Sequence, residues 1–147
     1  ESTPRAYLDH THMHDHPAVL GAFGAMPEAP LFDKETMQRT FDYVWDHWEW
    51  EETWGWDFPL TAMTAVRLGQ PERAIDALFM QPETNTYLVN GHNYQDGRLR
   101  LYLPGNGGLL TAVAIMCAGY DGCTIEEPGI PKNGKWNVQW EDLSPMP

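Results

Sequence analysis

Two indole rings beside a carboxylate form the part of this sequence best suited to chemistry. Residues 53–59 read Thr-Trp-Gly-Trp-Asp-Phe-Pro, so Trp54 and Trp56 flank a glycine and Asp57 follows directly. Indole faces stack on the apolar faces of sugar rings, and a neighbouring carboxylate can bind hydroxyls or transfer a proton. Tryptophans alone are as typical of a hydrophobic core as of a binding site. Together with the carboxylate, they predict a carbohydrate site.

A second loop of similar chemistry lies further along the chain. Residues 90–94 read Asn-Gly-His-Asn-Tyr and lead to residues 102–108, Tyr-Leu-Pro-Gly-Asn-Gly-Gly. Amides and imidazoles suit hydroxyl recognition because each can both donate and accept a hydrogen bond. Asn-Gly pairs are also strong turn formers, which is the alternative interpretation of these asparagines. The residues that we predict to bind substrate are Trp54, Trp56, His92, Asn93, Tyr94 and Asn106.

Cleavage of a glycosidic bond needs a general acid together with a base or a nucleophile, and both are normally carboxylates. Asp57 is the first candidate because it stands where a helix should begin. The same position suits a helix cap, which is its alternative role. Glu52 is the second candidate, although a glutamate at an exposed helix end is more commonly solvated. The sugar, its linkage and the choice between retention and inversion cannot be read from the sequence, because the last depends on a distance.

Four histidines, His10, His12, His14 and His16, alternate with other residues near the N-terminus. This spacing places all four on one face of an extended segment, and such a face can bind zinc or nickel. Short histidine tracts near a terminus also bind metal adventitiously. We therefore assign no metal ion and no other cofactor to the protein.

The elements that must position these residues are mostly helical, as the spacing of apolar residues indicates. The helices predicted over 58–68 and 109–118 are apolar nearly all round and should be inner helices. Those beginning at Asp33 and at Gln70 are amphipathic and should cover them. The polar connection 82–105 is too long for a simple link and is predicted to be functional. The full set of predicted helices is 17–26, 33 to about 50, 58–68, 70 to just before Pro82, and 109–118, and period-two alternation predicts a strand over 135–140.

The alternation of inner and outer helices predicts an all-α fold in which helical hairpins form part of an (α/α)6 toroid. A short β-strand segment would lie in the C-terminal tail, 134–147. A closed toroid needs about twelve helices, and the pattern supplies about five. We therefore expect residues 1–147 to be a single domain that is the C-terminal fragment of a larger catalytic toroid. The alternative is a partial bundle that covers its exposed helix faces as a homo-oligomer.

Composition limits the classes of partner. The formal charge of −12 argues against binding to nucleic acid and to anionic membrane surfaces. No run of about 18 apolar residues is present, so we predict no membrane-spanning segment. Cys117 and Cys123 are expected to be a buried thiol and a loop thiol, with a disulfide as the alternative in an exported protein. The sequence leaves the location open, and a periplasmic or secreted protein would need an upstream signal peptide.

Three motifs follow one another along the chain: Asp-His-Pro-Ala-Val-Leu-Gly-Ala-Phe-Gly at 15–24, Trp-Gly-Trp-Asp-Phe-Pro at 54–59, and Tyr-Leu-Pro-Gly-Asn-Gly-Gly-Leu-Leu at 102–110. In this order they resemble the C-terminal part of bacterial six-hairpin glycosidases, the (α/α)6-barrel enzymes related to glycoside hydrolase families 65 and 95. The resemblance implies a substrate pocket at the N-terminal ends of the inner helices. It also implies a general acid upstream of this region, so that the chain alone should be inactive.

The resemblance has one departure that bears on the chemistry. The α-L-fucosidase branch carries an aspartate two residues before the asparagine of this last motif, in the role of base. Pro104 occupies that position here, two residues before Asn106, which leaves the base unassigned.

Other classes of protein would show different signals. A non-catalytic carbohydrate-binding or scaffold module would keep the aromatic residues without paired carboxylates. A sugar phosphorylase would need a basic cluster for phosphate, and the long loop offers Arg98 and Arg100. A purely structural helical protein would not respond to sugar. We expect part of a glycoside hydrolase whose partner is an oligo- or polysaccharide.

Overall fold

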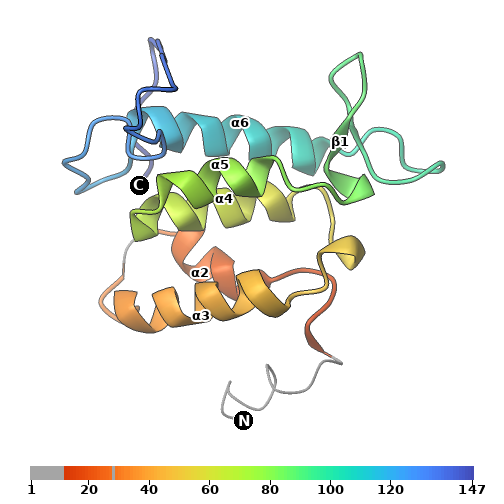
Figure 1. Ribbon diagram of the computed structural model, residues 1–147, viewed down its shortest axis with the longest axis horizontal. Helices are drawn as coiled ribbons and strands as arrows, with labels where there is room; N and C mark the ends of the chain where they lie inside the picture. The colour runs from red at the N-terminus through yellow and green to blue at the C-terminus, as the bar shows by residue number, and fades with distance from the viewer. Residues whose placement is uncertain (1–11, 28) are drawn as a thin grey trace.

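The computed structural model describes residues 12–27 and 29–147 (Figure 1). Its helices pack around α4, and a small antiparallel pair of strands lies near the start of α6. The predominantly helical prediction is confirmed. The α-helices are α2 (Gly21–Gly24), α3 (Lys34–His47), α4 (Asp57–Leu68), α5 (Pro71–Leu78) and α6 (Leu103–Ala118); the 3-10 turns are η2 (Ala18–Leu20), η3 (Trp50–Glu52) and η4 (Glu83–Asn85); the strands are β1 (Thr86–Tyr87) and β2 (Asn93–Tyr94).

Helix α4 is the centre of the fold, because each of its residues from Asp57 to Leu68 is buried. It lies between α6 on one side and α2 and α3 on the other, with α5 alongside (Figure 1). The predicted inner helix 58–68 is thus confirmed. Full burial of a side chain such as Phe58 contributes about 1.5–3 kcal/mol. The other large, fully buried apolar residues are Met13, Leu20, Phe41, Val44, Val66 and Ile115.

Helix α3 begins where the sequence predicts and ends earlier. Asp33 caps it, because its side chain accepts a hydrogen bond of 2.8 Å from the Thr36 N–H. The helix was expected to continue to about Trp50, but it ends at His47. Trp48 leaves the helix because its indole N–H donates to the Asp15 carbonyl at 3.1 Å. The backbone N–H of Glu49 donates to the Met13 carbonyl, so contacts with the N-terminal segment take the place of further helical hydrogen bonds.

The single helix predicted over 17–26 is in fact the turn η2 followed by the four-residue helix α2. Close contact with α4 favours this compact arrangement. A Cβ atom on Gly24 would stand 2.3 Å from the Thr64 hydroxyl, so only glycine allows the two helices to come this near. The Thr64 hydroxyl in turn donates to the Leu20 carbonyl at 3.2 Å.

Helix α6 begins six residues earlier than the predicted 109, at Leu103. The sequence 104–108, which contains three glycines, would ordinarily be read as a loop. It is helical here because Gly105 and Gly108 allow the helix to approach Asn93 and Pro59 more closely than a side chain would permit.

The predicted C-terminal strand is wrong. Residues 135–140 have no neighbouring strand, so this segment of alternating apolar and polar residues forms no β-sheet hydrogen bonds. The tail instead forms a parallel bridge between Tyr120 and Met146, near the end of α6. Cys117 is buried in α6 and Cys123 lies in the turn after it, both as free thiols.

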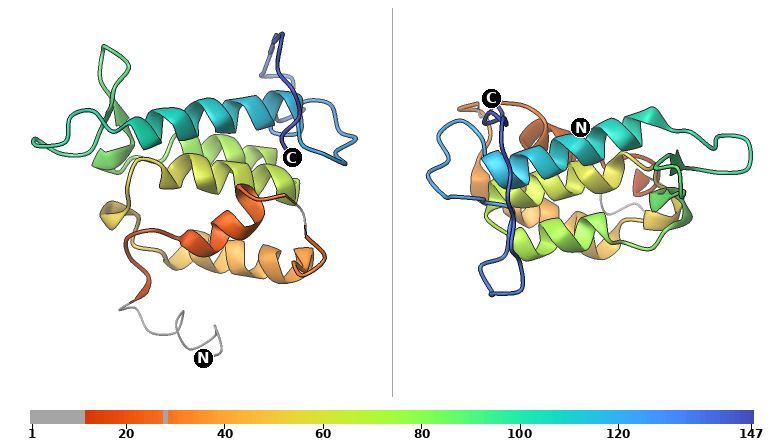
Figure 2. Two further views of the ribbon diagram at one scale, coloured as in Figure 1. Left: turned by 180° about the vertical axis from the view of Figure 1, so that it is seen from behind. Right: turned by 90° about the horizontal axis from the view of Figure 1, so that it is seen from above.

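One face of α6 carries large apolar side chains that no other described element covers. The exposed fractions are 66% for Leu103, 73% for Leu110 and 44% for Val113. The helix runs from the β1–β2 hairpin at one end to the C-terminal tail at the other (Figures 1 and 2). Within residues 12–27 and 29–147, no helix combines the length and the apolar character needed to cross a bilayer.

The cap of α3 gives a prediction about acid stability. Hydrogen bonds from the Thr36 hydroxyl and N–H lower the pKa of Asp33 from its ordinary 3.8. A lowered folded pKa stabilises the fold above the unfolded pKa, and that stabilisation disappears as the pH falls through the folded pKa. Asp33→Ala should therefore lower the Tm at neutral pH, with the difference from wild type vanishing at strongly acidic pH. Thermal unfolding followed by circular dichroism checks this. Asp76→Ala, an exposed acid on α5, is the matched control, and an equal loss there would contradict the capping role.

Candidate active site

The sequence-predicted site residues come together at one end of the helical bundle. The N-terminal ends of α4 and α6 point to the same side of the molecule, and the loops before them lie next to each other (Figure 1). The N-terminal segment 12–17 completes this end, because Trp48 and Glu49 bind its backbone. The two loops that the sequence singled out are therefore neighbours in space.

Asp57 lies at the first turn of α4 with none of its surface exposed. Its Oδ2 accepts the Trp54 backbone N–H at 2.8 Å. Both carboxylate oxygens lie near Nδ1 of His16, at 3.0 and 3.2 Å. Burial raises the pKa of Asp57 above its ordinary value, while the hydrogen bonds from Trp54 and His16 oppose that rise. Asp57 itself is not at the surface, and the group that it contacts there is the partly exposed imidazole of His16.

Aromatic side chains surround the exposed part of this pair. The ring centroid of His16 is 6.0 Å from that of Trp54 and 5.0 Å from that of Trp56. Tyr102, just before α6, stands 5.6 Å from Trp54. The exposed fractions are 38% for Trp54 and 36% for Trp56, and that of the His16 side chain is 34%. The result is a partly exposed aromatic surface around an imidazole that is bound to a buried carboxylate.

The buried amide of Asn93 connects the segments that carry these aromatic residues. Asn93 is fully buried, and its Nδ2 donates to the carbonyls of Thr84 and Thr86 at 3.1 and 3.2 Å. Its Oδ1 accepts from Gln95 Nε2 at 2.8 Å, and Gln95 Oε1 accepts the Gly55 N–H at 2.8 Å. This chain of hydrogen bonds links the hairpin to the tryptophan loop. The prediction that Asn93 contacts substrate does not match its position, because its amide faces the protein interior.

Two glycines leave room for this amide. A Cβ atom on Gly55 would stand 1.9 Å from Asn93 Oδ1, and one on Gly105 would stand 2.1 Å from the same atom. Both distances are far below van der Waals contact. The glycines of the Trp-Gly-Trp and Pro-Gly-Asn sequences therefore serve close packing around one buried oxygen.

The remaining predicted binding residues form the rim of the second loop. Asn106 binds two backbone groups, accepting from the Asn93 N–H at 3.0 Å and donating to the Gly91 carbonyl at 2.7 Å. His92 and Tyr94 are half-buried on the hairpin. Asn106 thus ties α6 to the hairpin, and it does so from within the helix, not from the turn that the Asn-Gly pair suggested.

Two of the exposed carboxylates at this end of the molecule lie near histidines. Glu52, in η3, is 3.8 Å from His14 Nδ1 with 62% of its side chain exposed. Asp15 Oδ1 is 3.4 Å from His16 Nε2. The backbone of Asp15 has φ of 61°, a left-handed conformation that is uncommon outside glycine, and its carbonyl accepts the Trp48 indole N–H.

The histidine series does not gather into a metal centre in the part of the chain that the structure describes, where no group of three or more His, Cys, Asp or Glu residues could hold an ion. His10 lies outside the described residues. His16 turns instead toward Asp57, and His14 toward Glu52.

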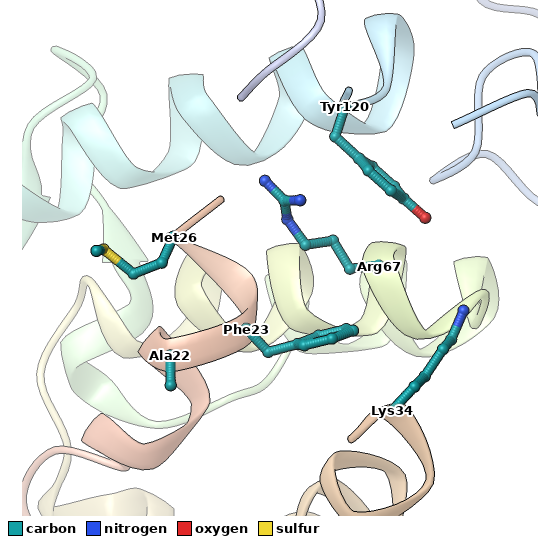
Figure 3. Close-up of a pocket in the computed structure, with 6 residues that line it drawn as sticks. All are labelled: Ala22, Phe23, Met26, Lys34, Arg67 and Tyr120. Atoms are coloured by element: carbon teal, nitrogen blue, oxygen red, sulfur yellow. The ribbon is translucent and has the colours of Figure 1, made fainter. Parts of the chain in front are cut away.

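A separate hollow lies at the opposite end of α4 (Figure 3). Arg67 crosses it, with its guanidinium 4.7 Å from the centre of the Tyr120 ring and its Nη2 donating to the Pro147 carbonyl at 2.6 Å. These contacts hold the C-terminal tail against the bundle. The residues lining the hollow are Ala22, Phe23, Met26, Lys34, Arg67 and Tyr120.

Comparison with known proteins gives no relative for this chain. No family model, no curated protein and no solved structure matches it.

Sequence reasoning did not assign three residues of this site. Gln95 gave no signal, because a lone glutamine has no characteristic spacing. Tyr102 was visible only as the start of a glycine-rich motif. His16 stood out only in the histidine series and in the motif at 15–24. Its pairing with Asp57 spans 41 positions, a separation that periodicity does not reveal.

The packing around Asn93 can be tested with two glycines of α6. Gly105→Ala should destabilise the protein by about 1–3 kcal/mol, because the new Cβ would overlap Asn93 Oδ1. Gly107→Ala is the matched control in the same helix, where nothing lies within 4 Å of the added carbon. It should be neutral or stabilise by about 0.5–1 kcal/mol, since alanine favours the helix. Urea denaturation gives the free energy of unfolding of both variants. Equal changes in the two would contradict tight packing around Asn93.

Proposed function

We propose that the protein binds carbohydrate at the end of the bundle formed by α4 and α6, and that it is part of a glycoside hydrolase. The observation that carries the proposal is the partly exposed group of Trp54, Trp56 and Tyr102 around the His16–Asp57 pair. Aromatic faces bind the apolar faces of sugar rings, and the polar groups between them bind hydroxyls.

Charge and exposure favour a neutral, hydroxyl-bearing ligand over an anion. The protein carries a formal charge of −12, and Asp15 and Glu52 lie exposed beside the aromatic surface. An anionic ligand would be repelled by these carboxylates, because like charges repel strongly at short range. A sugar can instead donate its hydroxyl hydrogens to them.

Hydrolysis needs a pair of carboxyl groups on either side of the glycosidic bond. Asp57 is enclosed and acts through His16, so a substrate would meet the exposed carboxylates of this end directly, Glu52 and Asp15 among them. We propose that the general acid is supplied from outside this chain. The chain alone then binds sugar without turnover. A non-catalytic carbohydrate-binding module is the second candidate, and it shares the aromatic surface.

The outer face of α6 favours a larger assembly. Leu103, Leu110 and Val113 form an apolar row on a surface helix, and exposed rows of this kind mark sites that another surface covers. In the toroid proposed here, further helical hairpins cover this row. Self-association of the chain is the alternative way to bury it.

Substitution of the tryptophans tests the binding function. Trp54→Ala and Trp56→Ala should each weaken sugar binding by roughly twofold to twelvefold, because each removes a stacking surface contributing about 0.5–1.5 kcal/mol. An array of α- and β-linked oligosaccharides identifies a ligand, and isothermal titration calorimetry gives the Kd. Trp136→Ala, in the tail and 43% exposed, is the matched control. Equal losses in all three variants, or no ligand on the array, would contradict the proposal.

A double substitution tests the alternative of self-association. Leu110→Ser with Val113→Ser should leave the free energy of unfolding within about 0.5 kcal/mol of wild type, because both side chains are exposed. If copies of the chain cover this row, the double variant should be a monomer at concentrations where the wild-type protein is an oligomer. Light scattering after size-exclusion chromatography measures the mass. Val89→Ser, at the exposed hairpin, is the control, and a monomeric wild type would rule out self-association.

A further inference from the structure

The His16–Asp57 pair allows a more specific statement about how the site recognises its ligand, and that statement rests on the proposed carbohydrate function. We propose that His16 Nε2 accepts a hydrogen bond from a ligand hydroxyl, with Asp57 as the positioning residue that keeps the imidazole proton on Nδ1. Asp15 is the second acceptor, so the ligand presents two adjacent hydroxyl groups.

Burial separates the roles of the two residues. Asp57 has no exposed surface, so a ligand cannot touch it. The His16 side chain is 34% exposed, and its ring lies near those of Trp54 and Trp56, with centroids 6.0 and 5.0 Å away. A sugar ring stacked on either indole would therefore meet the imidazole edge, and the exposed ring nitrogen would be its nearest polar atom there.

The hydrogen bonds of Asp57 determine where the imidazole proton lies. An ionised carboxylate can only accept hydrogen bonds, and a neutral imidazole carries one N–H. Both oxygens of Asp57 lie within 3.2 Å of Nδ1. A proton on Nδ1 satisfies the buried carboxylate and leaves the lone pair on Nε2, just as the partner of one ring nitrogen fixes the other in metal-bound histidines.

Trp56 competes for the same nitrogen. Its indole N–H lies 2.9 Å from His16 Nδ1, and an indole can only donate, so this contact favours a lone pair on Nδ1. The carboxylate contact should win, because hydrogen bonds to an ionised group are roughly twice as strong as neutral ones. A lone pair at Nδ1 would also leave the buried carboxylate facing another acceptor.

The position of Asp15 identifies the chemistry of the ligand. Its Oδ1 lies 3.4 Å from Nε2 and would itself favour a proton on that nitrogen, but the Asp15 side chain is 57% exposed, so water can satisfy its carboxylate, whereas the buried Asp57 depends on Nδ1. With the proton on Nδ1, Nε2 and Asp15 Oδ1 are two acceptors side by side at the surface. A single hydroxyl can satisfy one of them, and adjacent hydroxyls on a sugar ring can satisfy both. Trp48 holds Asp15 in its left-handed backbone conformation, which keeps this pair of acceptors together.

The tautomer can be measured without any ligand. Long-range proton–nitrogen NMR spectra of ¹⁵N-labelled wild-type protein, at a pH about two units above the ordinary histidine pKa of about 6.5, distinguish the two ring nitrogens. The expected result is a protonated Nδ1 and an unprotonated Nε2. The opposite tautomer in wild type would overturn the proposal, and this measurement needs no variant to fold.

Two variants separate the competing partners of Nδ1. In Asp57→Asn, the amide oxygen takes the Trp54 N–H and the amide N–H faces His16, so the proton should move to Nε2. Trp56→Phe removes the indole donor, and the wild-type tautomer should remain. If the tautomer changes in Trp56→Phe but stays unchanged in Asp57→Asn, the positioning role of Asp57 is overturned.

The ligand half of the proposal is tested by titrating the same labelled protein with the methyl glycosides of glucose, galactose, mannose, rhamnose and fucose. The glycoside that binds should shift the His16 Nε2 signal together with the Trp54 indole signal. A glycoside that shifts the indole alone overturns this inference and leaves the proposed function standing. An Nδ1-protonated His16 with no response to any glycoside counts against the carbohydrate function itself.

Discussion

The buried amide of Asn93 is the interaction on which the candidate site depends. Its oxygen lies against the backbone of Gly55, before α4, and against the backbone of Gly105, in α6. Its nitrogen donates to the carbonyls of Thr84 and Thr86, in the segment that leads into the hairpin. A buried amide is stable only when its polar atoms are paired, so the position of each of these segments constrains the others.

Helix α4 brings a carboxylate into this packed end of the molecule. Every residue of the helix is buried, so Asp57 at its first turn has no direct access to water. The N-terminus of a helix carries partial positive charge, which favours an anion there. The Trp54 N–H and His16 supply further stabilisation, against the burial that raises the pKa of Asp57. A carboxylate held in this way is suited to orient a neighbour and poorly suited to meet a ligand.

Local patterns in the sequence predict the parts of the fold that local physics controls. The mostly apolar run in α4 and the Asp33 cap of α3 follow from helix periodicity and capping alone, and both are confirmed. The early start of α6 could not be predicted, because three glycines favour a loop until Asn93 and Pro59 are known to lie against them. The strand over 135–140 failed for the converse reason. Its alternation is real, but a strand needs a partner, and none lies beside it in the described chain.

In the candidate site, too, the sequence predicts what local residue types determine and misses what tertiary packing determines. Residue types in the tryptophan loop and the second loop predict that both contribute, and the structure brings the two loops together. The sequence does not reveal which residues face outward, because Asp57 and Asn93 look like ligand-binding groups and are buried. Their polar atoms are engaged with the protein, and this leaves Trp54, Trp56, Tyr102 and His16 at the surface. The two buried residues fix the positions of the exposed ones, so substitutions at either should act on binding through geometry and not through a lost contact with the ligand.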